Sequence, residues 1–472
     1  MSTIIPANSA SGPDVFDVTN SCRFNPSDSS KMSKTSSSAG NSYKGTLSAW
    51  VKRSNLGSQQ IIGRQDADYA RVVFLPNGAL RCYGNNSAEN NAFDLVTTAL
   101  FKDFSSWYHI VFAWDTTQST ASNRNKVYVN GVQQTSFTTE TNNPQNTSIG
   151  GGYFANSAGL FISGKTGDYF NGYMAEIVGI ENTTYGPTAF GEFDEDSGIW
   201  KPLESVADLT FGTNGFYLNF KDASNLGNDA NGGTDFTESN LEATDQSTDT
   251  CTNNFATLNP ADVMRSQGNN IYLPSYSEGN LKMSDTATNN YSAFSTIAVE
   301  TGKWYWEMKT PNGANGNLGS RIGLFYGNNK VHGGSYYNGA DGYLVHQNGS
   351  IYTNGASTGY MAAFTNNGII TFALDKTNGL SYLGANGSWA DGNGNTNQSF
   401  ANAVAVETKL SSTMPSGTTQ PFFDVYGNTN QLLNFGSPPY AVSSGNTDGN
   451  DFGNFEYAPP SGFLALCTKN LS

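Results

Sequence analysis

Charged side chains are scarce in this sequence, because Lys, Arg, Asp and Glu make up only 13% of its 472 residues. The net charge is -15, and the few basic residues form no cluster. Surfaces that bind phosphate need clustered Lys and Arg, so we expect neither nucleic acid nor an anionic membrane surface as a partner. No apolar run approaches the ~20 residues of a membrane-spanning helix, so no membrane insertion is expected.

Cysteine is also rare. The four cysteines are Cys22, Cys82, Cys251 and Cys467, which lie far apart and form no Cys-x-x-Cys pair. A structural zinc site usually needs such local pairs. We therefore expect free and mostly buried thiols, with two long-range disulfides as the alternative.

Motifs of common enzymes and of export signals are missing. The sequence has no Gly-x-Ser-x-Gly, His-Glu-x-x-His or P-loop pattern. Of the three histidines, His109 lies in the alternating stretch WYHIVFA, where a packed or hydrogen-bonded histidine is expected instead of a catalytic base. The stretch MSTIIPANSASG has no basic or apolar region of a signal peptide, so no classical export signal is expected. We expect neither catalytic residues nor a cofactor.

Turn-forming residues and aromatics are abundant, with 52 glycines, 56 asparagines and 13% aromatic residues. Apolar runs alternate with period two and are joined by Gly/Asn turns, a pattern typical of an all-β protein. Three hairpins are predicted: VVFLPNGALRC, NKVYVNGVQQ turning at Asn130-Gly131, and GIITFALDKTNGLSYL turning at Asn378-Gly379.

Two blocks of this pattern each resemble a known family. The stretch FSSWYHIVFAWDTT…NKVYVNGVQQ resembles the centre of a laminin-G/concanavalin-like jelly roll, and FNGYMAEIVGIEN resembles its last strand. In the second block, GKWYWEM, GYLVHQNG and LLNFG resemble strands of a SPRY domain, although NNGIITFALD stands where that family has Gly-Asp-Val-Ile-Gly. These resemblances imply two tandem concanavalin-like jelly-roll β-sandwiches.

The composition divides the chain into five parts. We expect an N-terminal arm or covered first strand, with plain disorder as the alternative. It is followed by a laminin-G/concanavalin-like sandwich, a polar linker or strap, a SPRY-like sandwich and a C-terminal tail that docks on a sheet through Phe463, Leu464 and Leu466. Their bounds are residues 1–40, 41–225, 226–268, 269–436 and 437–472.

Two segments resemble tail-fibre and other virion proteins of marine tailed phages: TNGFYLNFKDASNLGND…TDTCTNNFATLNP and GNDFGNFEYAPPSGFLALCTKNLS. The resemblance implies a non-enzymatic structural protein on the outer surface of a virion, as a fibre or appendage that contacts host-surface glycans. Its partners would be other virion proteins and further copies of itself, with a trimer favoured. A head-decoration protein and a polysaccharide depolymerase are the alternatives.

The depolymerase alternative depends on the strand GYMAEIVGIEN. Glucanases of the laminarinase type carry Glu-x-Asp-x-x-Glu on such a strand, and this chain has Val178 at the Asp position between Glu176 and Glu181. Strand alternation places Glu176 and Glu181 on opposite faces unless a bulge intervenes, for which Gly179 is the candidate. We therefore expect an edge-like strand with solvated glutamates and no catalytic pair.

Candidate ligand sites are few. Aromatic rings between Gly and Asn residues could stack on sugars, and they are Tyr153, Phe154, Tyr336, Tyr337 and Trp389. Packing within the protein is the alternative for each of them. Calcium is the metal to consider, because many laminin-G domains bind it; its candidate ligands are Asp66, Asp68 and Asp168. Ordinary turn residues are the favoured explanation of these aspartates, because Asp is expected in turns anyway.

Overall fold

A computed structural model describes most of the chain, and the chain separates into two compact units. Among the described residues, the units are 16–254, called here the first unit, and 255–471, the second unit. The described residues are 16–36, 38, 40–65, 69–86, 91–149, 153–154, 159–204, 206–262, 264–266, 273–285, 290–312, 319–327, 330–332, 341–354, 356–364, 367–427 and 429–471.

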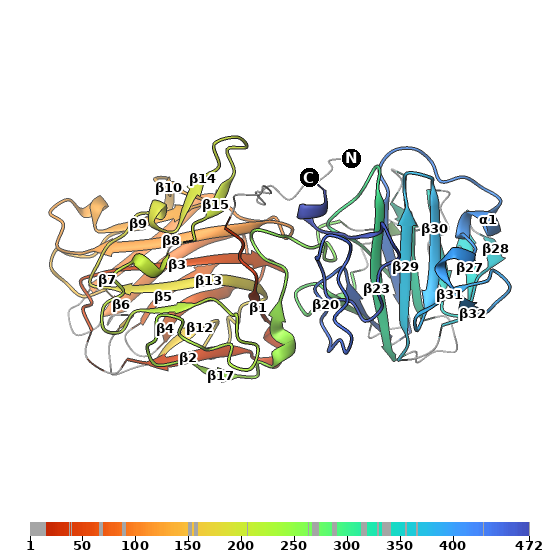
Figure 1. Cartoon of the computed structure of the whole chain (residues 1–472). Helices are drawn as coiled ribbons and strands as arrows, with labels where there is room; N and C mark the ends of the chain where they lie inside the picture. The colour runs from red at the N-terminus through yellow and green to blue at the C-terminus, as the bar shows by residue number, and fades with distance from the viewer. Residues whose placement is uncertain are drawn as a thin grey trace. The chain divides into compact units, whose positions relative to one another are not determined.

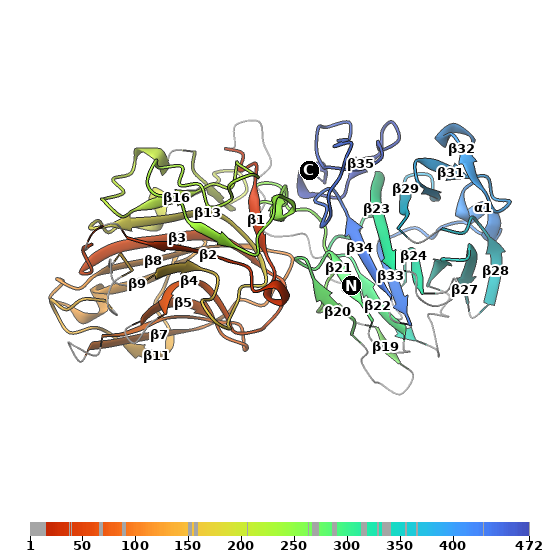
Figure 2. The same cartoon turned by 90° about the horizontal axis from the view of Figure 1, so that it is seen from below.

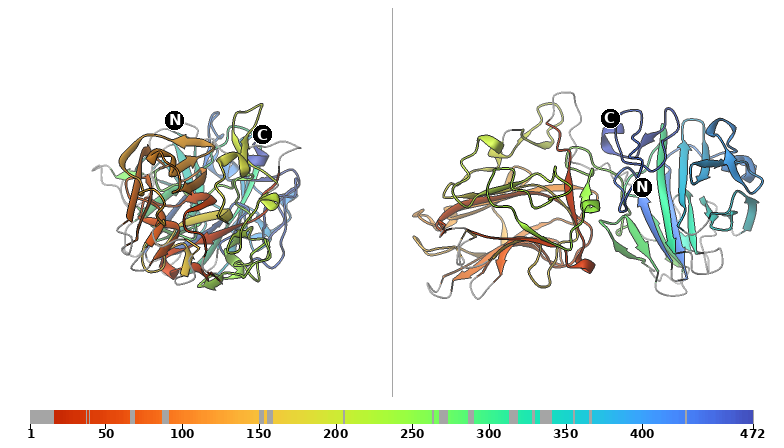
Figure 3. Two further views of the ribbon diagram at one scale, coloured as in Figure 1. Left: turned by 90° about the vertical axis from the view of Figure 1, so that its left-hand side faces the viewer. Right: turned by 60° about the horizontal axis from the view of Figure 1, so that its bottom comes forward.

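The first unit is a sandwich of two antiparallel sheets, which Figure 3 shows as facing layers. In spatial order, sheet A contains β10 (Val132–Gln134), β9 (Asn125–Val129), β8 (Trp107–Asp115), β3 (Lys44–Arg53), β13 (Gly172–Glu181), β1 (Ser21–Phe24) and β18 (Gln246–Ser247), with β16 (Phe216–Leu218) also paired to β13. Sheet B contains β11 (Phe137–Thr141), β7 (Asn91–Leu100), β6 (Ala79–Asn86), β5 (Tyr69–Phe74), β4 (Gln59–Gln65), β12 (Gly159–Ile162), β2 (Lys31–Thr35) and β17 (Thr237–Ser239).

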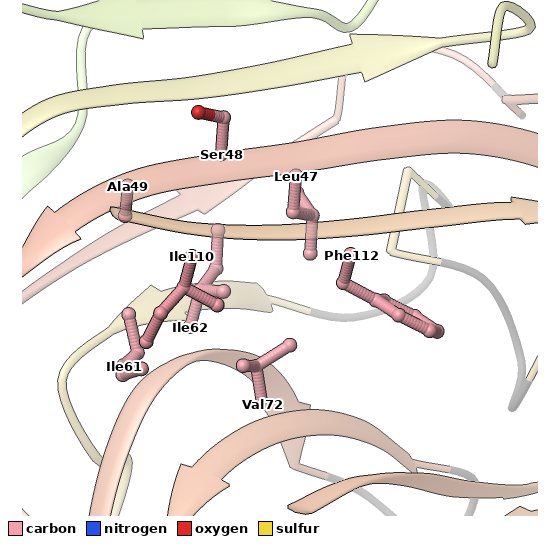
Figure 4. A pocket seen from close by; sticks show the side chains of 8 residues that line it. All are labelled: Leu47, Ser48, Ala49, Ile61, Ile62, Val72, Ile110 and Phe112. Atoms are coloured by element: carbon pink, nitrogen blue, oxygen red, sulfur yellow. The ribbon is translucent and has the colours of Figure 1, made fainter. Parts of the chain in front are cut away.

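Alternating apolar residues of the two sheets meet in the interior of this sandwich. Figure 4 shows that Leu47 of β3 and Phe112 of β8 point from sheet A toward Ile62 and Val72 of sheet B. Ser48 of β3 points away from sheet B. All four apolar side chains are buried. The reversed direction of Ser48 follows from the period-two alternation of a strand, and it marks the outer face of sheet A.

The predicted hairpins of this unit are confirmed. Strands β5 and β6 flank Pro76-Asn77-Gly78, and β9 and β10 flank Asn130-Gly131. Asn130 and Gly131 have φ values of 48° and 78°. Two consecutive positive φ values give the turn twist that matches paired strands, so the Asn-Gly sequence sets the hairpin locally.

The second unit is a second antiparallel sandwich (Figures 1 and 2). Its sheet C contains β20 (Ser275–Ser277), β21 (Lys282–Ser284), β34 (Asn430–Asn434), β23 (Lys303–Asn312), β29 (Ile369–Asp375), β30 (Leu380–Ala385), β31 (Ser388–Ala390) and β32 (Thr396–Gln398), with β35 (Leu464–Ala465) added parallel to β23. Its sheet D contains β22 (Asn290–Phe294), β33 (Gln420–Tyr426), β24 (Ser320–Phe325), β26 (Gly342–His346), β27 (Ser350–Thr353) and β28 (Ala356–Tyr360).

Two short strand pairs and a few short helices complete the described part of the chain. The pairs are β14 (Gly191–Phe193) with β15 (Trp200–Pro202), and β19 (Arg265–Ser266) with β25 (Val331–His332). The helices are α1 (Val406–Leu410) and the 3-10 turns η1 (Pro26–Asp28), η2 (Ala121–Asn123), η3 (Pro187–Ala189), η4 (Val206–Asp208), η5 (Ala243–Asp245), η6 (Phe400–Asn402) and η7 (Thr468–Asn470). No helix in the described ranges combines the length and the hydropathy that crossing a bilayer requires.

The all-β prediction is confirmed, and two polar segments belong to the first sandwich. Residues 21–35 supply β1 and β2, which lie inside sheets A and B, so the covered strand, and not an arm, is the expectation that holds for them. Residues 237–247 were expected in a linker or strap, yet they supply β17 and β18, which pair with β2 and β1. The polar composition of both segments hid these strands, because the partners of β17 and β18 are β2 and β1, which lie far away in the sequence.

The C-terminal residues of the second unit lie on sheet C. Strand β35 pairs with β23 at Trp304 and Tyr305. Phe463 and Leu466 are 3% and 0% exposed. Phe255, the first residue of this unit, forms an antiparallel bridge with Cys467, so the two ends of the unit are neighbours.

Candidate functional site

Strand β13, which carries the two candidate glutamates, is a central strand. It pairs with β3 on one side and with β1 and β16 on the other. Glu176 and Glu181 are each only 6% exposed. The expectation of an edge-like strand with solvated glutamates is therefore wrong, because the polar segments around β1 and β16 cover the edge that the sequence pattern left open.

A bulge interrupts β13, but at Glu176 and not at Gly179. The register against β3 shifts between Ala175 and Val178, and Glu176 has a φ of 48°, in the left-handed region. Gly179 serves a different purpose, since a Cβ atom there would come within 2.2 Å of the Phe216 ring. The glycine thus allows β16 to approach, and the strained residue of the bulge is a glutamate.

The two glutamates face opposite sides of sheet A, as alternation predicts. Ile177 belongs to the interior core, whereas Val178 and Ile180 belong to a cluster on the outer face. Glu176 lines a small cavity on the outer face together with Val178. Glu181 accepts hydrogen bonds from the backbone N–H groups of Asn41 (2.6 Å) and Asn214 (2.8 Å). A retaining glycosidase needs two carboxyl groups about 5–5.5 Å apart across one substrate, an arrangement that opposite faces do not provide.

Glu176 is held in a nearly closed environment. The Tyr217 hydroxyl donates a short hydrogen bond to its Oε2 atom. Burial raises the pKa of Glu176 to about 7, although the Tyr217 hydrogen bond and Lys221 act in the opposite direction. The adjoining cavity measures about 10 Å³, which is room for about one water molecule. A carboxyl with this pKa resembles a catalytic acid, but the cavity does not admit a sugar.

His109 lies in the same buried cluster and makes two hydrogen bonds. Trp200 Nε1–H donates to its Nδ1 atom at 3.0 Å, and its Nε2 atom lies 2.8 Å from Ser48 Oγ. Because Nδ1 accepts, Nε2 carries the proton and donates to Ser48. This tautomer is the reverse of the one that activates a serine nucleophile. Burial lowers the pKa of His109 to about 3. The prediction of a packed, hydrogen-bonded histidine is confirmed.

The segment from residue 185 to residue 211 covers this outer face. It includes the β14–β15 hairpin, which Figure 1 shows on the outer side of sheet A near β8 and β10. The Trp200 ring stacks on His109 with a centroid distance of 5.9 Å, and Phe190 and Val206 pack on Val178 and its neighbours. The face of sheet A on which Glu176 lies is therefore occupied by the chain itself.

The candidate sugar-stacking rings that the structure describes are buried. Tyr153 and Phe154 are 2% and 1% exposed, and both rings pack on Trp114, at centroid distances of 5.2 and 6.2 Å. Trp389 is 8% exposed and packs edge-on against Phe400. Packing within the protein therefore holds for these three residues, and stacking on a sugar does not, because turn residues at the rim of a sandwich can point their rings inward.

The remaining two candidates, Tyr336 and Tyr337, lie outside the described residues. Sequence reasoning missed Tyr360, which is 45% exposed at the end of β28. Its ring lies between two glycines, since a Cβ atom at Gly349 or Gly394 would come within 2.9 Å of it. The signal was available in the sequence, because Tyr360 follows a glycine in the polar stretch NGASTGY.

The calcium candidates give no cluster of ligands within the described ranges. Asp168 forms an ion pair with Arg71 at 2.8 Å, and Asp66 and Asp68 lie outside the described residues. No group of three or more His, Cys, Asp or Glu side chains that could hold a metal occurs in the part of the chain that the structure describes. All four cysteines are free and buried, as predicted.

Buried charged groups, which sequence reasoning missed, hold a peripheral segment on each sandwich. In the first unit, Lys52 of β3 pairs with Asp249 at 2.7 Å, and both side chains are 1% exposed. In the second unit, Glu307 of β23 accepts hydrogen bonds from the backbone N–H groups of Glu456 (3.1 Å) and Tyr457 (2.8 Å). The signal was a charged residue inside an apolar strand, AWVKR and WYWEM.

Part of the first unit matches a known protein family. Residues 27–178 match the family model of the Concanavalin A-like lectin/glucanases superfamily. The matched range ends within β13, so it includes the strand with Glu176 and excludes the segment that covers it. The chain thus contains a laminin-G/concanavalin-like domain. A search of curated proteins found no match.

Two solved SPRY domains and a solved pentraxin are similar to parts of this chain at low sequence identity. The SPRY domain of human HERC1 is 16% identical, with a TM-score of 0.29, and the match covers 37% of this chain and 96% of that one. A human SPRY domain is 11% identical, with a TM-score of 0.24, covering 34% and 94%. The heptameric SAP-like pentraxin from Limulus polyphemus is 13% identical, with a TM-score of 0.25, covering 34% and 76%. At these TM-scores the likenesses add nothing to the fold already described.

Proposed function

We propose that this chain is a non-enzymatic structural protein of a tailed-phage virion, a fibre or appendage that contacts host-surface glycans. Each contact would be weak and would gain strength through repetition on the particle. The partners would be other virion proteins and further copies of the chain, as a trimer on the outer surface of the particle.

The observation that carries the proposal is the covered outer face of sheet A. The candidate carboxyl Glu176 lies beneath the segment of residues 185–211, beside a cavity with room for about one water. Its potential partner Glu181 faces the other side of the sheet. This arrangement supports a scaffold and argues against this pair in a polysaccharide depolymerase.

The two segments that resemble virion proteins support the same proposal. In the first unit, the strap around Asp249 is fixed to β3 by the buried pair with Lys52. In the second unit, the tail around Glu456 and Tyr457 is fixed to β23 by Glu307. Both segments are therefore integral parts of rigid modules, which suits a protein displayed outside a particle.

Electron cryo-microscopy of the intact virion tests the proposal. A few copies in groups of three at the tail would support a receptor-binding fibre. Hundreds of copies over the head would support the head-decoration alternative, for which the same modules would serve. Absence of the chain from purified particles would overturn the proposal, and reducing ends released from host polysaccharide would then become the next measurement.

A further inference from the structure

Three side chains with complementary chemistry meet where residues 247–254, called here the strap of the first unit, lie against β3. The Lys52 Nζ atom lies 2.7 Å from Oδ2 of Asp249 and 2.6 Å from Oδ1 of Asn254. Lys52, Asp249 and Asn254 are 1%, 0% and 1% exposed. An amine, a carboxyl group and a carboxamide are thus in contact at a buried site.

The fold places each of the three groups independently of the others. Lys52 belongs to β3 in the middle of sheet A, where it pairs with Tyr173 of β13. Asp249 follows β18, and its backbone carbonyl accepts a hydrogen bond from Ser21 Oγ at 2.6 Å. The backbone then turns, with Thr250 N–H donating to the Asn253 carbonyl at 3.1 Å. This turn brings Asn254 back over Lys52.

Two further hydrogen bonds orient the reacting groups. Asn254 Nδ2 donates to the Ser105 carbonyl at 2.5 Å, which turns the carboxamide oxygen toward Lys52. Trp107 Nε1–H donates to Oδ1 of Asp249 at 3.1 Å, which leaves Oδ2 to face Nζ. The surroundings are aromatic, since the Tyr173 ring centroid lies 5.5 Å from Nζ.

We propose that Lys52 and Asn254 form an intramolecular amide bond, with Asp249 as the group that transfers the proton. In this step the Nζ lone pair attacks Cγ of Asn254, the bond from Cγ to Nδ2 breaks, and Nδ2 leaves as ammonia. Asp249 takes a proton from Nζ and delivers it to the departing nitrogen. The balance is one amine and one carboxamide giving one amide and one ammonia, so no oxidant, metal or other reactant is required.

The physical setting favours this step in three ways. The Lys52 Nζ atom and Oδ2 of Asp249 are in direct contact, so a single proton transfer between them would supply the neutral amine that attacks. A protonated Asp249 can then stabilise the charge that develops on Oδ1 of Asn254. The fold holds the amine and the carboxamide in contact, which replaces a bimolecular encounter with an intramolecular one.

The bond would join the last residue of the first unit to the centre of its own sheet A. The strap of residues 247–254 would then be unable to leave β3 even when its hydrogen bonds open. This inference is independent of the proposed function, because it concerns the chemistry of the first unit alone.

Mass spectrometry of the full-length chain tests the inference. The protein is first shown to be folded by near-ultraviolet circular dichroism, and is then denatured and digested with trypsin. The expected product is a branched peptide in which residues 45–53 are attached to residues 222–265, lighter than the sum of its parts by one ammonia. Lys52 is not cleaved in this product, because trypsin needs a free lysine side chain.

Two matched variants provide the control. Lys52→Arg keeps the positive charge and removes the amine, so the branched peptide should disappear completely. Lys44→Arg makes the same change in the same strand, at a side chain that is 38% exposed, and should leave the branched peptide intact. Asn254→Ala should also abolish the branched peptide. This variant keeps the test decisive if the larger arginine side chain of Lys52→Arg prevents folding.

The outcomes separate the inference from its rivals. Folded wild-type protein that yields linear peptides 45–52 and 222–265 would overturn it and leave an ordinary buried ion pair. A loss of ammonia without branching would also overturn it, since a succinimide formed at an asparagine has the same mass. Branching in the wild type and in Lys44→Arg, but not in Asn254→Ala, is the supporting result.

Discussion

Trp200 donates its indole N–H to Nδ1 of His109 at 3.0 Å, and this single bond fixes the tautomer of a histidine that is 1% exposed. It also joins the segment that covers sheet A to the sheet itself. The stability of this covering segment, residues 185–211 (called here the cover), and the protonation state of His109 are therefore linked.

Trp200→Phe should lower the free energy of unfolding by about 1–3 kcal/mol, because it removes the donor to a buried nitrogen. Denaturant unfolding measures this change. Val132→Ala, at a side chain that is 56% exposed, is the control and should change stability by less than about 0.5 kcal/mol. Equal stabilities of Trp200→Phe and the wild type would show that the indole N–H bond contributes nothing.

His109 itself should remain neutral across the ordinary pH range. Burial lowers its pKa to about 3, so the 15N signals of its imidazole should not change between pH 8 and about pH 5. The signals should show a proton on Nε2 and none on Nδ1. A titration near the ordinary value of 6.5 would contradict the closed environment described for this ring.

Glu176→Gln should change how stability depends on pH. The pKa of Glu176 is about 7 in the folded chain against 4.5 ordinarily, so between these values the folded chain binds the extra proton. The free energy of unfolding should therefore fall as pH rises through this window, by up to roughly 3 kcal/mol from this group. The variant should lack that fall, so its stability relative to the wild type should increase from pH 4.5 to pH 7.

Urea unfolding at a series of pH values measures this difference. Glu195→Gln, at an exposed position of the cover, is the control and should leave the wild-type profile unchanged. Parallel profiles for Glu176→Gln and the wild type would mean that Glu176 reaches solvent.

Glu307→Gln should loosen the C-terminal tail. The carboxylate accepts backbone N–H bonds from Glu456 and Tyr457, and also bonds from Asn434 Nδ2 (3.0 Å) and Tyr305 Oη (3.1 Å). A glutamine must direct its own N–H₂ group at one of these donors, at a cost of about 1–3 kcal/mol. Hydrogen exchange of residues 452–467 should become about ten to a hundred times faster. The exposed Glu300→Gln is the control, and equal exchange in both variants would contradict the anchoring role.

Tyr360→Ala should weaken glycan binding if the proposed function is correct. Loss of one stacking ring should lower the affinity of each site about three- to tenfold, while the melting temperature changes little. A glycan array followed by titration calorimetry measures this effect, with Tyr43→Ala, at a side chain 38% exposed in the first unit, as the control. Wild-type protein that binds no glycan would count against the proposed function, whereas binding unaffected by Tyr360→Ala would count only against this site.

The local features of the fold could be predicted from the sequence, and the long-range ones could not. The turn at Asn130-Gly131 is encoded by two adjacent residues, so its hairpin was predictable. Strand β1 pairs Cys22 with Gln246 of β18, and no local pattern in either polar segment reveals such a partner. For the same reason the buried state of Glu176 was missed, because β16 and the cover that bury it come later in the chain.

Side-chain direction was the other limit. Gly and Asn around Tyr153 and Phe154 correctly indicated a turn, but a turn does not determine which way a ring points. Both rings fill space next to Trp114 that only the assembled sandwich creates. Lys52 and Glu307 each alternate with core residues of their strand, and the groups they hold lie roughly 150 to 200 residues further along the chain.

The bridge between Phe255 and Cys467 has a mechanical consequence for the second unit. Because the pairing is antiparallel, the chain enters at Phe255 and leaves after Cys467 at the same end of the pair. A pulling force applied between these two points would open the pair bond by bond, as in a zipper, and would not load the strands of sheets C and D in shear. A force applied through the two ends of this unit would therefore act first on the contacts around Phe255 and Cys467, before it reached the pairing of β35 with β23.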